Sequence, residues 1–279
     1  MDGCIRWASD RRCLLGLWLL FAITSAQAVE PRTAMRSEPK TGIAPAKAPL
    51  LVASLSFVEP DGSRQPVVEV WSNGLVKAVE MRGTRQQPAR VTLTDRLSQP
   101  ELKELHQLLI GECQLANQTT ESVRESLQIA SQQRQLTADI DGAAATEIGV
   151  LAGPEWHSVA CPAVSILTTR FPDVAEVQNI AIAQNRLQNI AAVALVGGGK
   201  TADLHAATAT HKLRETHANA GEITRRELMM VRRLPNGSQF VQFRYAGLPG
   251  RDDACLVCVT HSPEGPTRVS VMESPTVVR

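Results

Sequence analysis

The sequence predicts an α+β fold in which antiparallel sheets pack against helices, arranged as two small domains. A hairpin signal, Ser72-Asn73-Gly74, separates two extended segments, since Asn and Gly tolerate the positive φ of a tight hairpin turn. From Asp173 to Val196, apolar residues recur at spacings of three and four, the period of a helix. Beyond three glycines, a further helix-forming run precedes extended segments, which indicates a second domain made of a helix plus a three-stranded meander.

Composition supports a globular chain and disfavours some partners. The 279 residues are 43% hydrophobic but only 4% aromatic, so the core is expected to consist of aliphatic side chains. The formal net charge is +1. Such a balance does not favour binding to nucleic acid or to an anionic membrane surface.

The first 28 residues have the pattern of a secretory signal peptide. Arg6, Arg11 and Arg12 form a basic start, and Leu14–Ile23 is apolar but too short to span a bilayer. Ala26-Gln27-Ala28 matches a small-x-small cleavage site. We therefore expect cleavage after Ala28, export to the periplasm or the extracellular space, and no later membrane segment.

Residues 29–50 are rich in Pro, Ala, Lys and Thr without a period, which predicts a disordered linker. Residues 51–196 are expected to form the N-terminal α+β domain. Apolar alternation and turn residues predict strands at 51–58, 67–71, 75–81, 91–93, 136–140, 146–151 and 155–161. Residues 162–170 fit either a short helix or an extended connection.

Helices in this domain are predicted from their caps and periods. Ser98-Gln99-Pro100-Glu101 reads as a capping box with an early proline, and the leucines that follow carry a helix to Gly111. A second helix is expected at Thr120–Ser131. For the long helix, Asp173 and Glu176 are predicted to form a capping box.

The C-terminal domain is assigned to residues 200–275. Its helix is expected at Ala202–Thr216, and the extended segments of its meander are 228–234, 239–246, 254–260 and 267–272. The last of these could present an unpaired edge to a partner.

Two resemblances follow from these residues. Gly197-Gly198-Gly199-Lys200, a helix ending near Thr216-His217-Ala218 and the following strands resemble the module of cystatin-like and PepSY-like domains. The longer pattern is similar to uncharacterised exported proteins of planctomycete-type bacteria. The residues that carry it are Leu97-Ser98-x-Pro100-Glu101-Leu102 through Leu105, Arg170-Phe171-Pro172-Asp173 followed by Val177 through Leu187, and Leu234-Pro235-Asn236-Gly237 through Phe243. These motifs imply a shared fold and transfer no activity. The nearest match to a cystatin inhibitory loop, residues 239–243, lacks its glycine, so protease inhibition is not supported.

Four cysteines remain after the predicted cleavage. In an oxidising compartment an even number favours disulfides, and Cys113 with Cys161 is the pair we single out, at a helix end and a strand end. Buried free thiols are the equally weighted alternative.

Cys255 and Cys258 have the spacing of a redox motif, but strand-forming residues surround them. Side chains three apart on a strand point to opposite faces, which argues against a bridge between them. The same alternation separates Cys258 from His261, so we expect neither a zinc site nor any other metal or cofactor.

The remaining polar residues are interpreted mainly as structural. His205, His211 and His217 recur every six residues, which predicts different faces of a helix and solvent exposure. Our leading hypothesis is an exported non-enzymatic protein that binds a protein or an envelope component. The alternatives are a PepSY-like regulator of a protease or other enzyme, and a hydrolase whose site is assembled from Asp139, Asp141, Glu147 and His157.

Overall fold

The computed structural model describes residues 48–84, 87–234, 236–246, 254–263 and 265–272. The predicted signal peptide and nearly all of the predicted linker lie outside these residues. No helix in the described ranges is long and apolar enough to cross a membrane.

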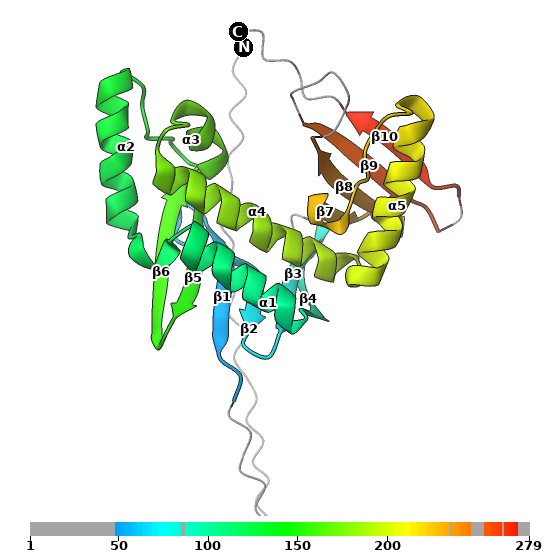
Figure 1. The fold of residues 1–279 in the computed structure, drawn as a ribbon, viewed down its shortest axis with the longest axis horizontal. Helices are drawn as coiled ribbons and strands as arrows, with labels where there is room; N and C mark the ends of the chain where they lie inside the picture. Colours follow the sequence, from blue (N-terminus) through cyan, green and yellow to red (C-terminus); the bar gives the residue numbers. More distant parts are fainter. Residues whose placement is uncertain (1–47, 85–86, 235, 247–253, 264, 273–279) are drawn as a thin grey trace, which may run out of the picture. The chain divides into compact units, whose positions relative to one another are not determined.

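The described residues confirm an α+β fold with two antiparallel sheets (Figure 1). The larger sheet has the order β4-β3-β2-β1-β5-β6, and the smaller sheet has the order β10-β9-β8-β7. The strands are β1 (Leu51–Val58), β2 (Arg64–Trp71), β3 (Leu75–Thr84), β4 (Gln87–Arg96), β5 (Ala145–Ala152), β6 (Glu155–Pro162), β7 (Leu228–Arg233), β8 (Gln239–Tyr245), β9 (Cys255–His261) and β10 (Arg268–Met272). All four extended segments predicted for the meander form strands, so this sheet has four strands instead of the expected three.

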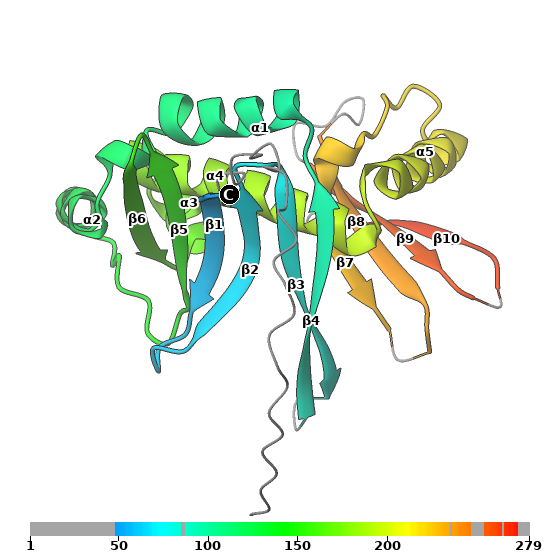
Figure 2. The ribbon, with the colours of Figure 1, turned by 90° about the horizontal axis from the view of Figure 1, so that it is seen from below.

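The helices are α1 (Gln99–His106), α2 (Thr120–Arg134), α3 (Val164–Arg170), α4 (Ala175–Val196) and α5 (Gly199–Thr216). A π-helical turn, η1 (Gln107–Glu112), continues α1, and two short 3₁₀ turns are η2 (Leu115–Asn117) and η3 (Arg225–Glu227). Figure 2 shows the β3–β4 hairpin extending beyond the neighbouring strands.

The larger sheet has one apolar face and one polar face. A buried row crosses it through directly paired residues: Val159, Ile148, Leu55, Val68 and Ala78. These residues are at most 1% exposed and belong to the core that α4 completes with Val177, Ile180 and Leu187. Because strand side chains alternate, the next residue on each strand points to the opposite face.

Helix α4 contributes to the cores of both sheets. Its buried side chains from Val177 to Ala191, together with Ala194, join the core of the larger sheet, whereas Ala192 and Val196 join the core of the smaller one. The described residues belong to one compact unit. The division into two domains at residues 196–200 therefore stays a prediction.

Two local predictions are wrong. The long helix begins at Ala175 after Val174, which makes no side-chain cap. Asp173 instead pairs with Arg134, and Glu176 accepts a hydrogen bond from Ser126. Residues 136–140 form no strand, although Ala138 and Ile140 still pack against the core.

Candidate functional site

The face of the larger sheet opposite the core carries a polar row. One residue comes from each strand, paired in consecutive register: Ser158, Gly149, Ser54, Glu69, Lys77 and Thr94. All except Gly149 are half-buried or exposed. Where a strand also contributes to the buried row, the polar residue is its sequence neighbour and therefore points to the opposite face. We call this face the polar sheet face.

Trp156 lies on this face over Gly149 of the neighbouring strand. A Cβ built at Gly149 would lie 2.2 Å from Trp156 Cζ2 and 2.9 Å from Ser54 Oγ. The indole therefore rests on bare backbone next to the Ser54 hydroxyl. It remains 44% exposed.

A pocket of about 320 Å³ opens beside this indole. Its polar lining residues are Ser54, Ser56, Arg64, Glu69, Glu147 and Ser158. A register shift between Leu55 and Ser56 lies at its wall, consistent with the frequent occurrence of β-bulges beside binding sites.

Glu147 is held in place within the pocket. Arg64 lies 2.6 Å from its Oε2 and donates to its Oε1 at 2.9 Å, and the Ser158 hydroxyl donates to Oε1 at 3.0 Å. The Glu147 side chain is 18% exposed, whereas that of Arg64 is 62% exposed. The pocket thus presents a fixed carboxylate, a partly exposed guanidinium and several hydroxyls.

Trp71 lies on the same face, three strands from Trp156. Strand spacing places the two backbones about 14 Å apart. The Lys77 ammonium lies 4.8 Å from the centre of the Trp71 ring, a cation–π geometry. The buried indole N–H of Trp71 has no hydrogen-bond acceptor among the described residues. Trp156 therefore lines the pocket, whereas Trp71 lies on the same face of the sheet but outside the pocket lining.

This arrangement is suited to a ring that has an apolar face and polar edges. An exposed indole offers flat apolar surface, and convergent hydroxyl, carboxylate and guanidinium groups can satisfy the hydroxyls of a ligand. Sequence reasoning missed the site, although a signal was present. Trp7 and Trp18 fall in the predicted signal peptide, so Trp71 and Trp156 are the two that remain of four tryptophans.

A second pocket, of about 270 Å³, lies beneath α1 and η1. Its apolar lining residues are Val52, Ala53, Leu102, Leu105, Leu109, Ile110, Val150 and Leu151. Its polar lining residues are Ser72, Gln99, Lys103 and His106. The predicted capping box is confirmed here, because the Ser98 and Glu101 side chains bond each other's backbone N–H groups.

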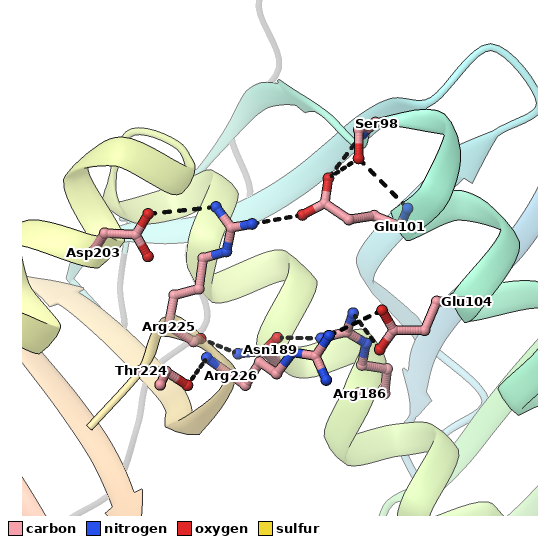
Figure 3. A network of polar contacts seen from close by, with 9 residues as sticks. All are labelled: Ser98, Glu101, Glu104, Arg186, Asn189, Asp203, Thr224, Arg225 and Arg226. Atoms are coloured by element: carbon pink, nitrogen blue, oxygen red, sulfur yellow. Dashed lines mark hydrogen bonds and ion pairs between the residues drawn. The ribbon is translucent and has the colours of Figure 1, made fainter. Parts of the chain in front are cut away.

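A polar network on the other side of α1 links it to η3, α4 and α5 (Figure 3). Arg225 bridges Glu101 at 2.8 Å and Asp203 at 3.5 Å, while Arg226 and Arg186 lie 3.0 Å and 3.8 Å from Glu104. Burial opposes ionisation of Glu101, but bonds from Ser98 and the charges of Arg225 and Arg186 outweigh it and lower the pKa of this carboxyl. Three arginines face three carboxylates, so the network fastens the helices together and leaves no excess charge for a ligand.

His205 and His261 form a hydrogen-bonded pair between α5 and β9. His261 Nε2 lies 2.7 Å from His205 Nδ1, and His261 Nδ1 lies 2.8 Å from the Thr267 hydroxyl. His205 is only 7% exposed, so its predicted exposure is wrong. Burial, and to a lesser extent His261, lowers the pKa of His205 to about 4, and burial also lowers that of His261.

The candidate disulfide between Cys113 and Cys161 is absent, because both residues are buried free thiols. Both belong to the core of the larger sheet, where they pack as small apolar side chains. Burial raises the pKa of Cys161 to about 12. Burial, with the charge of Glu112, raises that of Cys113 to about 11. Cys258 accepts a weak hydrogen bond from Gln242.

Of the residues named for a hydrolase site, Asp139, Glu147 and His157 do not converge. Glu147 lies on the polar sheet face, whereas His157 pairs with Val150 in register and shares the opposite face. Asp139 lines a different pocket, beside α2. Within the described ranges, no group of three His, Cys, Asp or Glu side chains is placed to hold a metal ion.

Comparison of the chain with models of known protein families and with characterised proteins gives no match. The resemblance to exported planctomycete-type proteins and to cystatin-like or PepSY-like modules therefore stays a prediction.

Proposed function

We propose that this protein is a non-catalytic binding protein that recognises a pyranose-based glycan of the cell envelope through the polar sheet face. The observation that carries the proposal is the placement of Trp156. Its ring atoms occupy the space above Gly149 and the side chain is 44% exposed, beside a pocket lined by hydroxyls and by the Arg64–Glu147 pair.

The chemistry of a pyranose matches these groups. One face of the sugar ring presents C–H groups that can stack on an indole, and its equatorial hydroxyls both donate and accept hydrogen bonds. Glu147 and Glu69 supply acceptors, Arg64 supplies donors, and the serines supply both. The predicted export signal is consistent with an envelope ligand.

The proposal can be tested by sedimentation of the full chain with purified peptidoglycan sacculi. We expect the wild type to sediment with the sacculi and soluble chitotriose to release it. Trp156→Ala should raise the apparent Kd about tenfold, which corresponds to about 1.4 kcal/mol of lost stacking.

Leu204→Ala is the matched control, because Leu204 is a 70% exposed apolar residue on α5, away from the polar sheet face. This variant should sediment like the wild type. Equal binding by Trp156→Ala and wild type, or a wild type that stays in the supernatant, would contradict the proposal. Release of soluble glycan fragments would show that the protein is a hydrolase instead.

A further inference from the structure

The pocket beneath α1 and η1 is separate from the polar sheet face and differs from it in chemistry. Leu105, Leu109, Ala53 and Val150 form its floor and are at most 2% exposed. Half-buried residues surround its mouth: Val52, Leu102, Ile110 and Leu151. The pocket is therefore an apolar cavity that opens to solvent.

The π-helical turn shapes one wall of this cavity. The N–H of Cys113 donates to the carbonyl of Leu108 at 2.8 Å, a bond across five residues in place of the usual four. The wider turn brings the neighbouring residues Leu109 and Ile110 to the same pocket. Single π-turns inside helices occur frequently at functional sites.

The lining of the pocket carries a lysine and a histidine but no carboxylate. Lys103 and His106 are exposed, and they are the titratable residues among its lining. The acidic residues of the same helix are occupied elsewhere, because Glu101 is bonded to Arg225 and Glu104 to Arg226 (Figure 3). An anionic group at the mouth would therefore meet the Lys103 ammonium and an imidazole that can donate a hydrogen bond, without a carboxylate in the lining.

We propose that this pocket binds a medium-chain alkyl carboxylate, with its chain in the apolar cavity and its carboxylate between Lys103 and His106. The cavity supplies the burial of the chain, and the Lys103 ammonium, with a hydrogen bond from the His106 imidazole, selects the anionic head group. The site is independent of glycan binding, because the two pockets have no lining residue in common.

The test is calorimetric titration of the full chain with decanoate below its micelle concentration, and with decanol as the uncharged probe. We expect saturable binding of decanoate at one site. Lys103→Glu should weaken decanoate binding about tenfold and leave decanol binding unchanged. Lys200→Glu, at an exposed lysine on α5, is the charge-matched control and should have no effect.

Leu102→Trp supplies a second variant, because a larger side chain at the mouth should fill the cavity and abolish binding of both probes. Its circular dichroism spectrum and melting temperature would establish that it is folded. Absence of decanoate binding to the wild type overturns the proposal. So does a Lys103→Glu variant that binds decanoate as tightly as the wild type, or a folded Leu102→Trp variant that still binds it.

Discussion

The indole of Trp156 occupies the space that a side chain at Gly149 would need, with Cζ2 only 2.2 Å from a Cβ built there. The two residues lie on adjacent strands, β6 and β5, and face away from the core. This contact fixes the orientation of the indole on the polar sheet face. Position 149 therefore needs a glycine because the Trp156 ring fills the space of a side chain, and not because the backbone there has a positive φ.

Gly149→Ala is expected to displace the indole and to destabilise the fold by about 1–3 kcal/mol, as overpacking does. Glycan binding should weaken together with stability. Chemical denaturation of Gly149→Ala, Trp156→Ala and the double variant measures the coupling. With Trp156 absent, the alanine at 149 should cost nothing or stabilise slightly, because it restricts the unfolded chain. Additive effects in the double variant would show that the contact is unimportant.

Asn189→Ala should destabilise the protein by about 1–3 kcal/mol, because two backbone carbonyls lose their donor. The Asn189 amide donates to Arg225 O at 2.8 Å and to Leu228 O at 2.9 Å, joining α4 to the start of β7. Asn185 lies one turn earlier on α4 and is exposed. Urea unfolding of Asn185→Ala is the control and should show almost no change. Equal effects of the two substitutions would contradict this role for Asn189.

Stability should fall between pH 7.5 and pH 5 because of His205. Its folded pKa of about 4 lies below the ordinary value of 6.5, so the unfolded chain binds the proton first as the pH falls. The stability contributed by the neutral ring is complete above about pH 6.5 and is lost toward pH 4. By pH 5 the expected loss is about 1–2 kcal/mol.

His205→Gln should have a smaller loss of stability over the same pH range, measured as the free energy of unfolding in urea at each pH. His211→Gln is the control, because the His211 side chain is 78% exposed. A His205→Gln variant with the pH dependence of the wild type would show that other groups cause it.

Cys113 and Cys161 should resist alkylation by iodoacetamide at pH 8 in the native protein. Burial raises the pKa of both thiols to about 11 and 12, so almost no thiolate forms. Peptide mapping after denaturation without reductant should find both residues alkylated. Recovery of their peptides as a linked pair that only reductant separates would restore the disulfide hypothesis.

The sequence was sufficient where the determinant was local. The Ser98–Glu101 capping box is confirmed because all of its atoms come from four consecutive residues. The same motif failed at Asp173, because Arg134, 39 residues away, pairs with that carboxylate. The strand predicted at 136–140 failed for a similar reason: its alternation buries Ala138 and Ile140 against the core without a partner strand.

The candidate sites could not be predicted from local sequence patterns, because they depend on contacts between distant segments. Trp71 and Trp156 share one face of the sheet only through the order β2-β1-β5-β6, in which β5 and β6 enter after α1, η1, η2 and α2. The burial of His205 depends on β9, 56 residues away. The spacing of six residues on a helix correctly separates three histidines but does not show which face the sheet will cover.

The most direct measurement of the central proposal is an NMR titration of the full, nitrogen-labelled chain with chitotriose, following the indole N–H signals. Trp71→Phe and Trp156→Phe variants would assign the signals of these two residues among those of the four tryptophans. We predict a saturable shift of the Trp156 signal, while the amide signal of Leu204 stays fixed. Unchanged indole signals at millimolar chitotriose, or shifts that map to other surfaces, would contradict glycan binding by the polar sheet face.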